Sequence, residues 1–152
     1  MKCLILASDK IDRLSMYDEP PALIQLHGVP LIERTIRDAM QAGLKNFYVV
    51  TGYKGKLVRH FLDKFAAKNE ITVTHIENDK PENGRAYAAS LAKKYLDGNF
   101  IMLSVDYIFD ILALASLVKS KAKSKDNVVA IDSDALQRKV DLVDVTRVHV
   151  SK

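Results

Sequence analysis

The sequence predicts an α/β protein with three layers, in which a mostly parallel, Rossmann-like sheet carries helices on both faces. Short apolar segments alternate with segments of amphipathic helical periodicity, which is the pattern of parallel βαβ units. Two of the apolar segments are almost continuously hydrophobic, as expected for central strands that are covered on both faces. The predicted strands span residues 2–7, 46–51, 71–76, 100–104, 127–132 and 145–150, and the second and fourth are the continuous ones.

Amphipathic helices are predicted over residues 30–42, 55–68, 85–96 and 108–122. Pro30 suits the first turn of the first helix, and Gly43 suits the position just after its end. In each helix the apolar side chains recur at three- and four-residue spacing, which predicts one buried face. The residues expected on these faces are Ile32, Ile36, Ala39 and Met40; Leu57, Phe61, Leu62 and Phe65; Tyr87, Leu91 and Tyr95; and Leu112, Ala115 and Val118.

The loops that follow the strands are predicted to form the ligand site. Right-handed crossovers between parallel strands bring every strand-to-helix loop to the carboxyl edge of the sheet, where ligands of such folds bind. The loops expected there span residues 8–21, 52–54, 77–85 and 105–110. The candidate functional residues lie in these segments.

Length and composition predict one globular domain over residues 1–152, with 48% hydrophobic and 28% charged residues. The chain has no run of about 18 apolar residues, and its first apolar segment is too short for a signal peptide, so we expect no membrane span and no leader. The single cysteine, Cys3, has no partner for an internal disulfide and lies in an apolar strand. These features fit a buried thiol in a cytoplasmic protein.

The formal charge of +4 fits an anionic ligand without identifying one. Part of the excess comes from lysines near the end of the last predicted helix, where the helix dipole favours cations. Because no aromatic side chains are interleaved with them as stacking platforms, a solvated helix end is preferred over a nucleic-acid or membrane patch. These lysines are Lys119, Lys121, Lys123 and Lys125.

The most informative segment of the sequence is residues 1–31. An apolar strand runs into Leu-Ala-Ser-Asp-Lys-Ile-Asp-Arg-Leu at 6–14, followed by Pro-Pro-Ala-Leu at 20–23 and Gly-Val-Pro-Leu at 28–31. This layout resembles the MobA-like nucleotidyltransferases, which activate sugars, polyols and alcohols, and is closest to the inositol-1-phosphate cytidylyltransferases. Their pattern is Leu-Ala-Ala-Gly-x-Gly-x-Arg-Leu, then Pro-Lys-x-Leu, then Gly-x-Pro-Leu-Ile. The resemblance implies the nucleotide-diphospho-sugar transferase fold. The domains of family members are longer than this chain, so the fold is expected to be incomplete here.

The resemblance assigns a phosphate loop to residues 6–14. The backbone around Leu6, Ala7 and Ser8 would bind the nucleotide, and Arg13 would be a catalytic residue that grips a phosphate with two N–H donors. From the residues alone, a surface arginine paired with a neighbouring aspartate is an equally good interpretation of Arg13.

Three residues depart from the family pattern in ways that affect phosphate binding. Asp9 and Ile11 replace the two glycines, which adds a carboxylate and bulk where the backbone should approach a triphosphate closely. Pro21 replaces a lysine whose ammonium would neutralise charge on the reacting phosphate, and losing such a group typically costs about a hundredfold or more in rate. We therefore expect weak nucleotide binding and slow or absent turnover.

A further resemblance lies in residues 77–85, Glu-Asn-Asp-Lys-Pro-Glu-Asn-Gly-Arg. This segment is similar to the Asn-Gly loop with which cytidylyltransferases of the family hold the base and ribose. Asn83 offers an amide to a base edge, and Gly84 lets the backbone approach the nucleotide. An ordinary turn that starts a helix is the alternative interpretation of this pair.

Residues 101–110 resemble the Met-Ser-Asp-His-Ile-Tyr-Asp segment of inositol-1-phosphate cytidylyltransferases. In this alignment Asp106 is a catalytic residue and the metal ligand, and a carboxylate just past a strand at the ligand edge suits Mg²⁺. The alternative for Asp106 is a turn residue, and Asp110 is interpreted as a helix N-terminal carboxylate that the helix dipole favours. The second metal-binding aspartate of the family comes from a part beyond this chain, so the second carboxylate near Asp106 is unaccounted for.

These segments predict a nucleotidyltransferase-like protein. A phosphomonoester oxygen would attack the α-phosphorus of a nucleoside triphosphate, with CTP favoured by the resemblance, and pyrophosphate would leave. The acceptor would be a small phosphorylated polyol, sugar or amino alcohol, Mg²⁺ would be the cofactor of an active protein, and a homo-oligomer is compatible. The alternative is a catalytically inactive homologue or fragment that binds a nucleotide or serves as a partner subunit.

Overall fold

The computed structural model describes residues 1–9, 18–120 and 128–130. Its centre is a four-stranded sheet in the order β5-β4-β1-β6, in which every neighbouring pair is parallel. The strands are β1 (Lys2–Ala7), β4 (Asn46–Thr51), β5 (Thr72–Glu77) and β6 (Phe100–Ser104). A small antiparallel hairpin pairs β2 (Gln25–Leu26) with β3 (Val29–Pro30).

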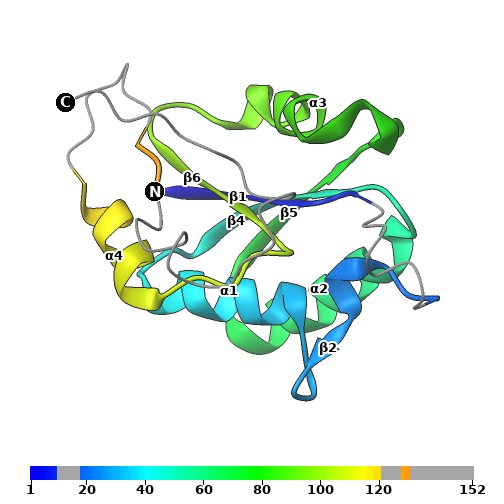
Figure 1. The fold of residues 1–152 in the computed structure, drawn as a ribbon, viewed down its shortest axis with the longest axis horizontal. Coiled ribbons are helices and arrows are strands. Elements are labelled where there is room, and N and C mark those ends of the chain that lie inside the picture. The colour runs from blue at the N-terminus through cyan, green and yellow to red at the C-terminus, as the bar shows by residue number, and fades with distance from the viewer. Residues whose placement is uncertain (10–17, 121–127, 131–152) are drawn as a thin grey trace, which may run out of the picture.

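Helices cover both faces of the four-stranded sheet, which confirms the predicted three-layer, mostly parallel α/β fold (Figure 1). On one face lie α1 (Leu31–Gln41), α2 (Gly55–Asn69) and α4 (Ile111–Lys119), and on the other lies α3 (Gly84–Leu91). Three single 3-10 turns are η2 (Pro21–Leu23), η3 (Pro81–Asn83) and η4 (Lys93–Tyr95). None of the helices in the described ranges is long and apolar enough to cross a membrane.

The strands β1 and β4 lie in the middle of the sheet and divide the core into two layers. Cys3 and Ile5 of β1 pack with α1 and α2, whereas Leu4 and Leu6 pack with α3. Phe47 of β4 is fully buried in the first of these layers. Because both faces of β4 are covered, its sequence is continuously apolar, as predicted.

The central position predicted for β6 is not seen among the described strands, where β6 pairs with β1 alone. Its side chains Ile101 and Leu103 pack into the first core layer, but Phe100 and Met102 are 41% and 55% exposed. The reason is that α3 packs over β1 and β4, so it covers only part of that face of the sheet.

The last two predicted strands are not confirmed. Residues 128–130, which belong to the predicted strand 127–132, form no strand, and Val128 and Val129 are exposed. The rest of that segment and the whole of the predicted strand 145–150 lie outside the described residues.

The predicted buried faces are confirmed for α1, and those of α2 and α4 are corrected at one residue each. In α2 the buried side chains include Val58 and Leu62, whereas Leu57 is exposed. In α4 the buried residue is Leu114, whereas Leu112 is exposed. Successive helical side chains point about 100° apart, so Val58, one position from Leu57, and Leu114, two positions from Leu112, can face the core in their place.

The helix α3 is shorter than the predicted 85–96 and packs through smaller residues. It ends at Leu91, and η4 follows it. Ala88 and Ala92 are fully buried against the sheet, while Tyr87 and Tyr95 are only partly buried. Small side chains let this short helix approach the sheet closely, so the larger ones extend around its sides.

The helix α4 begins later than the predicted residue 108 because Asp110 caps it. The Asp110 Oδ1 accepts hydrogen bonds from the backbone N–H groups of Leu112 at 2.7 Å and Ala113 at 3.2 Å. This is the geometry of an N-cap carboxylate, which confirms the helix interpretation of Asp110.

The thiol of Cys3 provides a test of the packing around β1. Cys3 is fully buried, and burial raises the pKa of its thiol to about 12. Because the thiolate is the reactive form, the native protein is expected to react very slowly with an aromatic disulfide reagent at about pH 8. Denaturant should restore fast reaction, since the unfolded thiol has a pKa of about 8.5. Cys3 is the single cysteine, so rapid labelling of native protein would contradict this packing.

Candidate functional site

The loops after β1, β4 and β6 meet at the carboxyl edge of the sheet, as predicted. The backbone N–H of Tyr53, after β4, donates to the carbonyl oxygen of Ser8, after β1, at 3.0 Å. The N–H of Val105, after β6, donates to the carbonyl oxygen of Leu6 at 3.1 Å. Backbone hydrogen bonds thus fix the described parts of these loops relative to one another.

Gly52 allows the close contact between the first two loops. A Cβ atom at this position would lie 2.7 Å from the carbonyl oxygen of Ser8 and 3.1 Å from its Cβ. The first distance is too short for any side chain, and Ser8 cannot retreat without losing its bond to Tyr53. Glycine is therefore required for this approach of the two backbones.

The predicted phosphate loop is described only at its beginning. Leu6 and Ala7 belong to β1 and are buried, and Ser8 is buried directly after the strand. The Ser8 Oγ donates to the Asp9 Oδ1 at 3.0 Å. Arg13, the predicted phosphate ligand, lies outside the described residues, as does Ile11.

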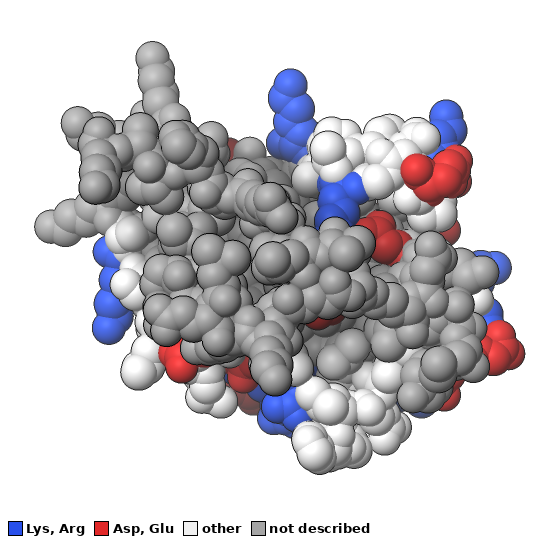
Figure 2. All heavy atoms as spheres, viewed as in Figure 1, with Lys and Arg blue, Asp and Glu red and all other residues white. Residues whose placement is uncertain are grey.

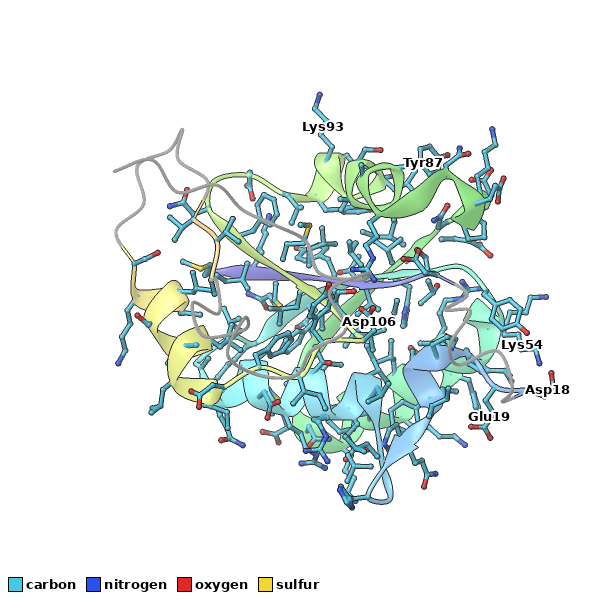
Figure 3. All side chains as sticks on the ribbon, in the orientation of Figure 1. Asp18, Glu19, Lys54, Tyr87, Lys93 and Asp106 are labelled. Carbon is cyan, nitrogen blue, oxygen red and sulfur yellow. The ribbon has the colours of Figure 1, made fainter. Side chains whose placement is uncertain are left out.

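Asp106 lies two residues after the end of β6, near the centre of the view in Figure 3. Its Oδ1 accepts a hydrogen bond from the Ser104 Oγ, and its Oδ2 accepts one from the Arg85 Nη2 at 2.6 Å. The side chain is 20% exposed. Both carboxylate oxygens are therefore held in place at the sheet edge.

Arg85, the second residue of α3, links two of the loops. Its Nε donates to the Asp9 Oδ2 at 3.3 Å while its Nη2 holds Asp106. The guanidinium also lies 5.6 Å from the centre of the Tyr107 ring. Partial burial alone would lower the pKa of Arg85, but Asp106 and Tyr107 outweigh it and raise the pKa above its ordinary value. The side chain is therefore a permanent cation between two carboxylates.

Asn83 and Gly84 form the turn into α3, in keeping with both interpretations of this pair. Asn83 is exposed. Gly84 has φ +78° and ψ −178°, a conformation that is essentially restricted to glycine. This torsion sets the direction in which α3 starts, and so it places Arg85.

Asn78 is a buried polar residue of the same edge that sequence reasoning missed. Asn78 is only 3% exposed, and its Oδ1 accepts a hydrogen bond from the backbone N–H of Lys80 at 3.0 Å. Its Nδ2 is buried and has no hydrogen-bond partner in the described part of the chain. An Asn that directly follows a strand and precedes Asp is a signal for such a turn.

Lys54, in the loop after β4, pairs with Asp18, and Pro21 begins η2. The Lys54 Nζ lies 2.5 Å from the Asp18 Oδ1 (Figure 3), and this pair lowers the pKa of Asp18 and raises that of Lys54. Pro21 is buried at the start of η2. In Figure 2, cationic (blue) and anionic (red) side chains lie next to one another at several places on the outline of the molecule.

The side chains at the sheet edge suit a small divalent cation. Asp9 and Asp106 offer hard carboxylate oxygens, and the Ser104 hydroxyl adjoins them. Mg²⁺ prefers oxygen ligands and is usually held by one or two carboxylates together with substrate phosphates. No cluster of three His, Cys, Asp or Glu residues with metal-binding geometry occurs in residues 1–9, 18–120 and 128–130. Two carboxylates fit a metal that a nucleotide helps to hold.

The carboxyl edge of this parallel α/β sheet thus carries two carboxylates that are joined by one guanidinium. Residues 3–142 match the MobA-like NTP transferase domain, and the chain belongs to that family. The family resemblance seen in the sequence is thereby confirmed.

Particular relatives lie among enzymes named for cytidylyl transfer. The chain is 33% identical over 122 residues to a bifunctional IPC transferase and DIPP synthase of Aquifex aeolicus, covering 78% of this chain and 27% of that protein. It is 27% identical to the choline-phosphate cytidylyltransferase of Streptococcus pneumoniae, covering 79% of this chain and 51% of that enzyme.

A solved structure of an inositol-1-phosphate CTP transferase from T. maritima has a similar fold. The TM-score is 0.67 at 26% identity, over 80% of this chain and 49% of that one. The chain therefore spans only about a quarter to a half of the length of these relatives.

Proposed function

We propose that this chain forms the nucleotide-binding part of a cytidylyltransferase that acts on a small phosphorylated polyol, sugar or amino alcohol. Family membership and the names of its relatives support cytidylyl transfer. The observation that carries the proposal is Asp106, a carboxylate held at the carboxyl edge of the sheet beside the loop that follows β1.

In the proposed reaction an oxygen of the acceptor phosphomonoester attacks the α-phosphorus of CTP. The bond from this phosphorus to the β-phosphate bridging oxygen breaks, and pyrophosphate leaves. Such a transfer depends on positioning and charge neutralisation rather than on covalent chemistry by the protein.

Each group at the site has a proposed role. Asp106 binds Mg²⁺, in keeping with the general use of a divalent metal by nucleotidyltransferases of this family, and the bound metal would neutralise phosphate charge. The turn that follows Leu6 and Ala7 supports the phosphates through Ser8 and, in the part outside the described residues, through Arg13.

The loop before α3 provides the proposed base site. The exposed amide of Asn83 is free to meet a base edge, and Gly84 leaves space beside the backbone, since no atom lies within 4 Å of a Cβ built there. The buried Asn78 holds the preceding turn through its bond to Lys80.

A second candidate function is that of a non-catalytic nucleotide-binding homologue or partner subunit. Pro21 favours it, because this buried residue provides no ammonium where the family pattern has lysine. Asp9 favours it as well, because it places a carboxylate where the family has a glycine.

Calorimetric titration with Mg-CTP and Mg-GTP tests the proposal. We expect binding of CTP at micromolar to submillimolar concentrations and weaker binding of GTP. Pyrophosphate release with phosphorylated polyols, sugars and amino alcohols then separates the two candidates. Binding without release supports the non-catalytic homologue, and the absence of heat with both nucleotides at millimolar concentration contradicts nucleotide binding altogether.

A further inference from the structure

Arg85 makes an unusual contact, because its guanidinium is shared between two carboxylates from different loops. The Nε and Nη2 groups form the fork with which an arginine commonly holds both oxygens of one carboxylate. Here Nε donates to Asp9 and Nη2 donates to Asp106. One fixed cation thus lies between the two negative groups that suit a divalent metal.

This contact occupies the oxygens that a metal would need. Arg85 holds Oδ2 of Asp106, and the Ser104 hydroxyl holds Oδ1 of the same carboxylate. A divalent cation cannot share this space with a guanidinium, since the two would repel at contact distance. Ligation by Asp106 and Asp9 together therefore requires Arg85 to leave.

The side chain of Arg85 is able to leave. It is 44% exposed, and the aromatic side chain beside it, Tyr107, is itself 49% exposed. Arg85 lies in the first turn of α3 and contacts Asp9, in the loop that is proposed to support the phosphates, so phosphates bound there would be within reach of its long side chain. A guanidinium that leaves one carboxylate pair is well suited to hold a phosphate instead.

We propose that Arg85 is an exchangeable counter-cation, which holds Asp9 and Asp106 together in the free protein and moves to the nucleotide phosphates when the divalent metal enters. This inference rests on the proposed function, in which Asp106 is the metal ligand. Asp9 thereby gains a role that opposes its effect on the phosphate loop, because it supplies a second carboxylate beside Asp106. Because Arg85 occupies the carboxylates of the free protein, the metal alone binds weakly, and the nucleotide increases the affinity for the metal.

Binding of Mn²⁺ alone, followed by the electron paramagnetic resonance signal of the free ion, tests this competition. Arg85→Gln removes the cation but keeps a long side chain, and we expect it to bind Mn²⁺ about tenfold more tightly than the unaltered protein. Arg37→Gln is the matched control: it removes the same charge from an arginine paired with Glu33 on α1, and we expect unchanged Mn²⁺ binding.

Adding Asp106→Asn to the Arg85→Gln variant should remove the gained affinity, which would assign the ion to this carboxylate. If Arg85→Gln binds Mn²⁺ no more tightly than the unaltered protein, including the case in which neither binds, the inference is overturned. Circular dichroism on each variant establishes that the fold is retained, and Arg85→Lys, which keeps the charge, should stay close to the unaltered protein.

The same samples separate this inference from the proposed function. With CTP present, Mn²⁺ should bind the unaltered protein more tightly than without it, and this gain should be smaller in Arg85→Gln. Tighter Mn²⁺ binding by Arg85→Gln without any CTP binding would contradict the proposed function alone. CTP binding together with unchanged Mn²⁺ affinity would contradict the counter-cation alone.

Discussion

The variant Asp106→Ala is expected to lower the affinity for Mg-CTP about a hundredfold or more. Loss of a residue that merely orients a metal ligand commonly costs about 10- to 100-fold, so loss of the ligand itself has at least the upper value. The substitution removes the contact that holds the Arg85 guanidinium at position 106, and the contact with Asp9 remains. The guanidinium therefore does not take the place of the metal at that position. Isothermal titration of both proteins with Mg-CTP measures the effect.

Asp97→Ala is the control for this variant. Asp97 forms an ion pair with Lys2, the first residue of β1, at the opposite edge of the sheet, and the substitution removes the same charge. We expect unchanged affinity for Mg-CTP. Equal losses in the two variants would show that overall charge rather than the metal ligand governs binding. If Asp106→Ala binds Mg-CTP with unchanged affinity, Asp106 is not part of the site.

The second large effect is expected for Phe47→Ala, which should lower the free energy of unfolding by about 3–5 kcal/mol. Phe47 is fully buried in a central strand, with Cys3 and Val73 beside it in the neighbouring strands. Its removal leaves a cavity that β1 and β5 cannot close, because both are fixed by backbone hydrogen bonds to β4. Urea unfolding followed by circular dichroism measures the loss.

Phe100→Ala makes a matched comparison, because it removes the same side chain from the partly exposed strand β6. We expect a loss of about 1 kcal/mol or less there. Similar losses at both positions would mean that β6 is covered to the same extent as β4.

The sequence predicted the sheet well because each strand is a local pattern. β1, β4 and β6 have the predicted bounds, since each is a short apolar run between polar loops. The partial exposure of β6 was not predictable in this way, because an apolar run does not tell which neighbours cover it. The same limit explains Leu57 and Leu112, whose spacing fits a helix face that other residues occupy.

The meeting of the loops at the carboxyl edge was predicted, but the side-chain contacts between them were not. Asp106 was proposed from its place after a strand, whereas Asp9 was noted only as the replacement of a family glycine, and the loops meet as expected from parallel crossovers. The role of Arg85 was missed, because its contacts cross 76 positions to Asp9 and 21 to Asp106. No local periodicity encodes such a contact. The role of Arg13 stays a prediction.

The turn at Gly84 has a stereochemical consequence for the whole edge. A Cβ of ordinary hand would meet no atom within 4 Å at this position, so crowding is not what selects glycine. The torsion of +78° selects it instead, and this torsion is comfortable for a residue of the opposite hand. D-alanine, introduced by chemical ligation, would therefore preserve the direction of α3, whereas L-alanine would rotate the helix start and draw Arg85 away from the ends of β1 and β6.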